Sequence, residues 1–236
     1  MRLRKRLMVS GQEYGLVKDT VALYYNRPGR AVFQVRATDD QAEALTGMVQ
    51  FALGWAHSDG MTLFFTGDIE RAVRVDGQQR RLFCREISAR LDSNIPLAIR
   101  HATLKDVLGA YAAATGLEFI LPEKPYATVK APAFYGHGSG FHGLACAGDI
   151  FGIADYHWQA QGDGKIFVGS WTDSRWPDRP GTISEEFFTA AGSAARKIAA
   201  VPTMRPGAVL NGQRIRLVRF SGHSMTVGFE DEPCAK

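Results

Sequence analysis

Short runs of β-branched and aromatic residues alternate with turn residues at both ends of this chain, and this pattern constrains the fold more than any other sequence feature. Runs bounded by Gly, Pro, Asp or Asn are typical of antiparallel strands, whereas a helical bundle needs longer stretches of helical period. Five such runs occupy residues 20–26, 30–37, 47–55, 61–75 and 81–88. Beyond residue 172, strands are predicted around Asn211-Gly212, a pair that favours a two-residue hairpin turn. We therefore predict an antiparallel barrel or sandwich.

The hydrophobic period changes in residues 94–171, where helices are predicted between strands. Residues 102–116 carry a helix pattern in which Thr103 is the N-cap, Asp106 favours the positive helix end, and Gly116 closes the last turn. Its predicted apolar face consists of Leu104, Val107, Leu108 and Tyr111.

A similar order of elements follows this helix. Residues 117–122 are predicted as a buried strand, residues 126–135 as extended, residues 139–152 as a second helix and residues 156–171 as a hairpin. We interpret residues 94–171 as two strand–helix–strand units. Their predicted core consists of Val107, Leu108, Tyr111, Leu117, Phe119, Ile150, Phe151, Trp158, Phe167 and Val168.

The predicted fold is mainly β with an inserted α+β module. The expected parts are a β-rich barrel domain at residues 1–93, the module at residues 94–171, and a loop with final strands at residues 172–236. A mixed segment at residues 184–202 is expected to cover a sheet edge. The last strands are expected to pair with the first part, which makes the outer β region discontinuous.

Charge and cysteine content exclude several classes of protein. The net charge is +4, and the basic run at residues 2–6 is expected to be a solvated strand or arm, so no specific nucleic-acid binding is predicted. No stretch approaches the roughly 20 apolar residues that span a bilayer, and no signal peptide or membrane insertion is predicted. The three cysteines, Cys84, Cys146 and Cys234, are widely spaced and suit reduced thiols in a cytoplasm.

Gly138, Gly140 and Gly143 match the spacing of a dinucleotide-binding turn. That site also needs an acidic residue about 20 positions further on, at the end of a strand. Asp163 lies there, but within a predicted hairpin turn. We expect the glycines to shape a strand-to-helix turn, and we expect no bound nucleotide.

Metal-binding and nucleophilic patterns are incomplete. His142 and Cys146 share one helix face, and His137 lies nearby, but no second ligand pair completes a metal site. Ser139 lacks the flanking glycines of a nucleophile elbow. Gly164-Lys165 lacks the earlier glycine of a phosphate-binding loop. No metal and no cofactor are predicted.

The carboxylates give no catalytic assignment. Asp149, Asp155, Asp163 and Asp173 fall at predicted turns and helix ends, where Asp commonly caps backbone groups. A glycosidase-type pair stays open, because the sequence does not establish the separation between two carboxylates. No catalytic residue is predicted.

Several segments together resemble hub proteins of tailed-phage baseplates. Residues 95–122 and 131–171 are similar to the hub of Mu-like transposable phages, within the wider late-control-D-like group. Residues 63–91 and 205–229 look like the β segments of such hubs. The resemblance covers most of residues 60–230 and rests on the order of elements and on small residue clusters.

This resemblance implies a structural, non-enzymatic virion protein of the viral tail. Such hubs form a homotrimeric ring of barrels related to tail-tube subunits. They join the tail tube or distal tail protein to the central spike or fibre that serves host attachment, after synthesis in the host cytoplasm. Some long-tail hubs hold an iron–sulfur cluster through four cysteines, but this chain has three, so the feature is not transferred.

Arg214 and Arg216 are the candidate assembly residues. They alternate with Ile215 and Leu217 along residues 213–220, so one face of a strand could pack while the other meets a partner. Two alternatives stay open: a tail-associated cell-wall hydrolase, and a secretin-like ring-building module, whose small domains residues 97–121 also resemble.

Overall fold

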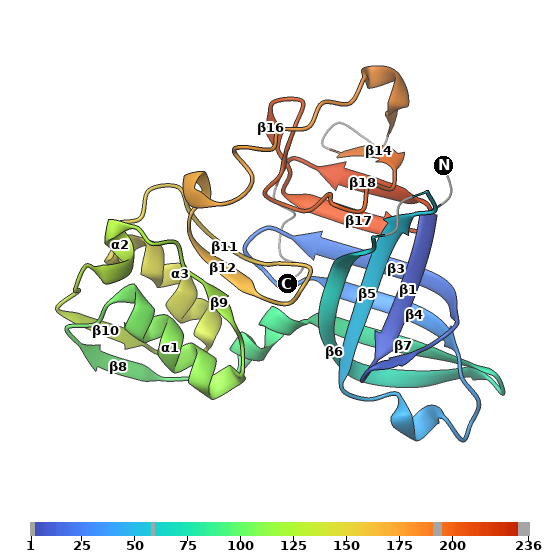
Figure 1. Ribbon diagram of the computed structural model, residues 1–236. Helices are drawn as coiled ribbons and strands as arrows, with labels where there is room; N and C mark the ends of the chain where they lie inside the picture. Colours follow the sequence, from blue (N-terminus) through green and yellow to red (C-terminus); the bar gives the residue numbers. More distant parts are fainter. Residues whose placement is uncertain (1–2, 58–59, 191–194, 231–236) are drawn as a thin grey trace.

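One large curled sheet draws its strands from both ends of the chain (Figure 1). The computed structural model describes residues 3–57, 60–190 and 195–230. Within them, the strand order is β13-β14-β18-β17-β3-β4-β7-β6-β5-β1-β2. The bounds are β1 (Leu3–Val9), β2 (Gln12–Glu13), β3 (Leu16–Tyr24), β4 (Arg30–Arg36), β5 (Met48–Trp55), β6 (Thr62–Asp76), β7 (Gln79–Glu86), β13 (Thr189–Ala190), β14 (Ala195–Ala199), β17 (Leu217–Ser221) and β18 (Ser224–Gly228).

Antiparallel hairpins build most of this sheet, as the spacing of β runs predicts. β3 and β4 pair around Pro28-Gly29, β5 pairs with β6, and β6 pairs with β7. β17 then pairs with the free side of β3, with Leu217 opposite Tyr24 and Ser221 opposite Thr20. The final strands therefore continue the sheet that the first strands begin.

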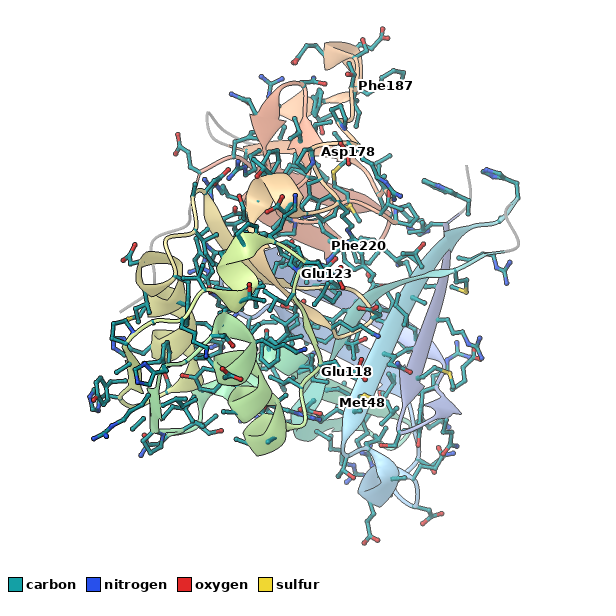
Figure 2. All side chains as sticks on the ribbon, turned by 60° about the vertical axis from the view of Figure 1, so that its left-hand side comes forward. Met48, Glu118, Glu123, Asp178, Phe187 and Phe220 are labelled. Atoms are coloured by element: carbon teal, nitrogen blue, oxygen red, sulfur yellow. The ribbon has the colours of Figure 1, made fainter. Side chains whose placement is uncertain are left out.

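The interior of the curl is one apolar core shared by early and late strands. In β4, Ala31, Phe33 and Val35 are buried and alternate with more exposed residues. The ring of Phe51 lies 5.0 Å from that of Phe33 and 5.7 Å from that of Phe220, between centroids. Figure 2 shows Phe220 on the last part of the chain, whereas Phe187 projects at its outer end and is 66% exposed.

The curl also brings β1 against β3. The ammonium group of Lys5 lies 2.6 Å from the carboxylate of the buried Asp19 on β3. Contacts between β1 and β3 thus bring together the two ends of the strand run β3-β4-β7-β6-β5-β1.

The middle of the chain forms a separate α+β module beside the sheet, and its hairpin β11–β12 lies between the two (Figure 1). β10 pairs with β8, while β12 pairs with β11 on one side and with β9, in parallel, on the other. The bounds are β8 (Leu97–Arg100), α1 (Leu104–Thr115), β9 (Phe119–Ile120), α2 (Pro125–Thr128), β10 (Ala133–Gly136), α3 (Gly140–Ile150), β11 (Tyr156–Ala160) and β12 (Ile166–Ser170).

Helix α1 has the ends and the buried face that its sequence predicts. Thr103 and Asp106 form a reciprocal capping box, and Gly116 adopts the left-handed conformation at φ 70°. The four residues of the predicted apolar face are buried. The prediction of this helix is confirmed.

Three predictions for the module are wrong. Residues 117–122 do not form a buried strand, because only Phe119–Ile120 pair and Ile120 is exposed. Residues 126–135 are not extended throughout, since they begin within the one-turn helix α2 and extend only at β10. Ile150 is not a core residue, because the last turn of α3 leaves its side chain 38% exposed.

The rest of the predicted core differs in detail. Phe167 is buried, but it packs toward His157, with 5.8 Å between ring centroids, and lies outside the apolar cluster of the module. Phe119 is partly buried against that cluster. The other seven predicted residues belong to it: Val107, Leu108, Tyr111, Leu117, Phe151, Trp158 and Val168.

The remaining segments are short. β15 (Val209–Leu210) and β16 (Gln213–Arg214) form the predicted hairpin at Asn211-Gly212, but the chain leaves strand geometry before β17. Residues 184–202 contribute β13 and β14 at one end of the large sheet. Single-turn or short 3-10 helices occupy Ala42–Ala44, Ile87–Asp92, Trp171–Asp173 and Glu185–Phe187.

The domain boundaries at residues 93 and 171 stay a prediction. In the part of the chain that the structure describes, no helix has the length and apolar character needed to cross a lipid bilayer.

Candidate functional site

The glycine-rich segment before α3 is a tightly packed strand-to-helix turn. Gly138 has φ +88°, a conformation that residues with a Cβ rarely adopt. A Cβ on Gly140 would lie 2.7 Å from Cδ2 of Leu91, and a Cβ on Gly143 would overlap the hydroxyl oxygen of Tyr111. Ser139 is the N-cap, accepting a hydrogen bond from the backbone of the third helical residue. These contacts confirm that the glycines serve backbone geometry and packing.

Two of the candidate metal ligands, His142 and Cys146, lie on the surface side of the same helix, and the third, His137, precedes the helix. The sulfur of Cys146 is 3.9 Å from Nε2 of His142, while His137 stacks on Tyr135. Among residues 3–57, 60–190 and 195–230, no three His, Cys, Asp or Glu side chains are grouped closely enough to hold a metal ion. Cys84 is buried, and burial raises the pKa of its thiol to about 12. Cys234 lies outside the described residues.

The carboxylates hold turns and ion pairs. Asp163 accepts a hydrogen bond from the backbone N–H of Lys165 in the β11–β12 turn. Asp173 accepts from Tyr126 at 2.9 Å and forms an ion pair with Lys124 at 2.9 Å. A hydrogen bond from Lys124 and one from Tyr126 lower the pKa of Asp173.

Arg214, one of the two candidate assembly residues, connects the C-terminal part to the middle module. Its guanidinium forms a bidentate pair with Asp155, with N···O distances of 2.9 and 2.6 Å, and lies 3.9 Å from the ring centroid of Trp171. This hydrogen-bonded arginine holds the pKa of Asp155 below its usual value. Arg214 is therefore engaged within the chain.

The guanidinium of Arg216 lies over the ring of Tyr25, 4.2 Å from the ring centroid. Ile215, between the two arginines, and Leu217, which follows Arg216, are both buried. The role of Arg214 and Arg216 in assembly stays a prediction.

An aromatic stack continues this contact into the module. The ring of Tyr25 lies 4.5 Å from that of His157, which is fully buried. The side-chain oxygen of Asn26 lies 3.2 Å from Nδ1 of His157 and accepts from the backbone N–H of Trp158. Burial lowers the pKa of His157 to about 3, so this histidine is neutral at physiological pH. We name Tyr25, Asn26, His157, Asp155 and Arg214 the junction cluster.

A buried ion pair joins the same parts further inside, and it was missed at the sequence level. Nη2 of Arg205 lies 2.9 Å from Oε1 of Glu86, whose other oxygen accepts from the N–H of Gly29 at 2.8 Å. The guanidinium also donates to the carbonyls of Phe64 and Ala160. Burial raises the pKa of Glu86, against the opposing effect of Arg205. No local pattern marks either residue, since 119 positions separate them.

Comparison with solved structures defines the class of fold. A tail protein of prophage MuSo2 from Shewanella oneidensis superposes with a TM-score of 0.67 over 94% of this chain and 96% of that chain, at 10% identity. A tail protein from Neisseria meningitidis gives a TM-score of 0.63 over 98% and 97% of the two chains, at 11% identity. The chain therefore has the fold of phage tail proteins, and the resemblance noted in its sequence is confirmed at this level.

A component of a secretion system and a chain of a VgrG-containing complex share the fold as well. A component of the type VI secretion system of E. coli, described as structurally similar to tail proteins of bacteriophage T4, gives a TM-score of 0.60 over 94% of this chain and 75% of that chain, at 11% identity. A chain of the Francisella PdpA-VgrG complex gives a TM-score of 0.61 over all of this chain and 59% of that chain, at 7% identity.

A phage protein is related in sequence. The chain is 31% identical over 231 residues to an uncharacterized 58.7 kDa protein from the region 3′ of lys in Haemophilus phage HP1. The alignment covers 98% of this chain and 42% of the relative, so the chain spans less than half of that protein. No protein-family model matches the chain.

Proposed function

We propose that the chain is a structural protein of a phage tail, and that it acts in the baseplate hub between the tail tube or distal tail protein and the central spike or fibre. The observation that carries this proposal is the fold that it shares, over nearly the whole of each chain, with a prophage tail protein and with a second tail protein. The phage relative supports the same setting. In this proposal the protein lies in the virion tail, serves host attachment and has no enzymatic activity.

The proposed assembly is a homotrimeric ring. Among the described residues, β13 pairs with only Arg196 and Lys197 of β14, so Ile198 and Ala199 have no strand partner on that side, and a neighbouring subunit can pair or cover such an edge. Identical neighbours related by cyclic symmetry cover such edges without leaving a growing end. The likeness to a chain of a VgrG-containing complex and to a secretion component supports an oligomeric setting.

We propose Arg216 as the better probe of the assembly surface. Arg214 also fixes the module through Asp155, so its reversal alters the fold as well as any interface. Arg216→Glu is expected to reduce incorporation into tails by at least about tenfold while changing the free energy of unfolding by about 1 kcal/mol or less. The matched control is Arg81→Glu, at an exposed position on β7. Equal incorporation of both variants would contradict a role for Arg216.

The position and copy number are tested by an electron-microscopic reconstruction of the assembled particle. The expected result is three copies around the tail axis, at the end of the tube and in contact with the spike or fibre. Six copies, one copy, or a position off the axis would each overturn the hub proposal. Solution mass alone does not decide it, because a free subunit can remain monomeric until it meets the tube.

A further inference from the structure

A hollow of about 310 Å³ lies on the outer face of the large sheet, over β1, β5 and β6. The pairing registers explain its position, because Ala52 on β5 lies between Arg6 on β1 and Leu63 on β6. The alanine side chain is short, so the surface dips between its two longer neighbours. Met8 and Met61 complete the apolar wall. The hollow is at the lower limit of pocket volumes, and it therefore suits one inserted side chain better than a larger ligand.

Positive charge lies beside this hollow. Arg6 is part of its wall, and Arg4 lies two positions earlier on the same face of β1, since alternate residues of a strand share a face. Arg6 already lies 3.1 Å from the carboxylate of Glu13. Arg4 is exposed and forms no ion pair with any residue that the structure describes. A side chain that enters the hollow is therefore favoured where it brings a carboxylate to Arg4.

A feature with the complementary properties projects from the other end of the sheet. We name the 3-10 turn Glu185–Phe187 the acidic knob. Phe187 is 66% exposed, more than any other large apolar side chain in the described ranges, and Figure 2 shows it at the outer end of the molecule. Glu186 beside it is also exposed and has no ion-pair partner within residues 3–57, 60–190 and 195–230. The knob thus carries an aromatic tip with a carboxylate next to it.

Neighbouring contacts hold the acidic knob in shape and leave its aromatic tip uncovered. The side chain of Asn211 accepts a hydrogen bond from the backbone N–H of Ile183 at 2.9 Å and donates one to the carbonyl of the same residue at 2.8 Å. Glu185 forms an ion pair with Arg196 on β14. Because the base of the knob is fixed, little conformational entropy is lost when the tip binds.

We propose that the acidic knob of one copy of this chain docks into the hollow of the next copy. The ring of Phe187 packs against Met8 and Met61, and sulfur-containing side chains contact aromatic rings favourably. The carboxylate of Glu186 lies beside Arg4. One aromatic anchor in an apolar pocket with a charged rim is the usual arrangement of a binding hot spot. This inference rests on the proposed function and deepens it by naming the contact between copies.

The location of the two surfaces favours a second copy as the partner. The acidic knob lies beside β14, near one end of the strand order, whereas β5 and β1 lie near the other end. The contact therefore joins unlike surfaces of two copies, and such head-to-tail contacts close a ring where the rotation between copies permits it. Nucleic acid and anionic lipid carry negative charge and are repelled by the carboxylates of the knob.

The contact is measured by NMR on two complementary variants of the complete chain, one of which carries isotope-labelled methionine methyl groups. The labelled variant, Phe187→Ser, keeps the hollow and lacks the aromatic tip. The unlabelled variant, Ala52→Leu, keeps the knob and fills the hollow. The two combine in one way only, so association through this contact stops at a pair. The methyl resonances of Met8 and Met61 should shift saturably, whereas that of Met225, which is buried in the core, should not move.

Charge variants test the rim of the hollow. Glu186→Arg in the unlabelled copy should weaken binding at least about tenfold, and Arg4→Glu in the labelled copy should do the same. Combining the two reversals should restore part of the affinity, because the two side chains again carry opposite charges. Glu43→Arg is the matched control, an equal change of charge at an exposed position of another 3-10 helix. It should leave the affinity within about twofold of the starting value.

Two results would overturn the proposal. They are no saturable shift at Met8 and Met61, and an equal shift when both copies carry Phe187→Ser. Where Ala52→Leu fails to fold, the unmodified protein replaces it and the same two resonances must respond. The copy number in the assembled particle is a separate result. Three copies without the methyl shift reject this contact and leave the hub proposal standing, whereas the shift together with six copies rejects the hub proposal and leaves the contact standing.

Discussion

Gly143 on α3 shows how one residue sets the distance between two helices. The hydroxyl of Tyr111 on α1 occupies the space that a side chain at position 143 would need, and Cζ of Tyr111 lies 2.7 Å from an added Cβ. The tyrosine is fully buried, and its hydroxyl has no hydrogen-bond partner in the described chain. The absence of a side chain at Gly143 thus allows the two helices to pack closely. The spacing of glycines in the sequence does not distinguish such a packing role from a role in ligand binding.

Gly143→Ala should destabilise the protein by about 1–3 kcal/mol, because it overpacks the contact with Tyr111. Gly109→Ala is the matched control, since it lies in α1 with open space around its Cβ and should stabilise by about 0.5–1 kcal/mol. Denaturant unfolding measures both. Adding Tyr111→Phe to Gly143→Ala should recover part of the loss, and the same loss at both glycines would contradict the steric explanation.

Asp155 gives a second prediction at this scale. Hydrogen bonds from Arg214 lower the pKa of Asp155 in the folded protein. The ion pair therefore stabilises the fold fully at pH values above the unfolded aspartate pKa of about 3.9. This contribution is lost as the pH falls through the lower pKa of the folded state. Asp155→Asn keeps a residue type that tolerates the observed φ of 46°. Because the carboxylate is 41% exposed, the expected cost at neutral pH is about 0.2–1 kcal/mol.

Unfolding of Asp155→Asn and the unmodified protein should be compared from neutral pH down to the acid limit of folding. The stability gap is expected to narrow below about pH 4. A gap that stays constant with pH would show that the asparagine acts through packing and not through charge.

At the scale of elements, predictability followed the range of the interactions. Helix α1 was predictable because its N-cap, its stop at Gly116 and its apolar period all lie within the element. Helix α2 was not, because a four-residue helix is too short to show a period. The strand predicted at residues 117–122 was too long, because only pairing with the parallel strand β12 decides which of these residues form β9.

Leu108 and Ile150 test the assignment of the two helix faces. Leu108→Ala should cost about 2–5 kcal/mol because the side chain is 3% exposed and leaves a cavity. Ile150→Ala should cost less than about 1 kcal/mol, because the end of α3 leaves this residue 38% exposed. Thermal or denaturant unfolding measures the stability of both variants. A similar loss of stability in the two would show that the buried face of α3 is assigned wrongly.

At the scale of the whole molecule, the pair of Glu86 and Arg205 ties β7, the backbone of β6 and the end of β11 together. Replacing one partner leaves the other buried without compensation, so Glu86→Gln should cost about 3–5 kcal/mol. The exposed pair of Lys165 and Glu118 is the control, and Lys165→Gln should leave the free energy of unfolding nearly unchanged. The double variant Glu86→Gln with Arg205→Met should regain part of the loss. A cost no larger than that of the control would contradict a buried pair.

This pair also marks the limit of what the sequence could predict. The β pattern, the inserted module and the resemblance to tail proteins follow from local periods and from the order of elements. Contacts such as the junction cluster depend on how β11, β16 and the β3–β4 turn meet, and no spacing along the chain encodes that meeting. Arg214 was singled out for an interface with another subunit, whereas the structure shows its partner within the same chain.

The pairing of β17 with β3 has a consequence for synthesis. Leu217 lies opposite Tyr24, so the free side of β3 must wait until residues 217–221 have left the ribosome. At roughly 5–20 residues per second, that interval is on the order of 10–40 seconds. During this interval the module can already bury its own apolar cluster. The first strands of a neighbouring nascent chain can meanwhile pair with the unpaired side of β3. Truncated chains that end before residue 217 should therefore leave one side of β3 unpaired and prone to aggregation. The amount that aggregates should depend on how quickly these chains are degraded.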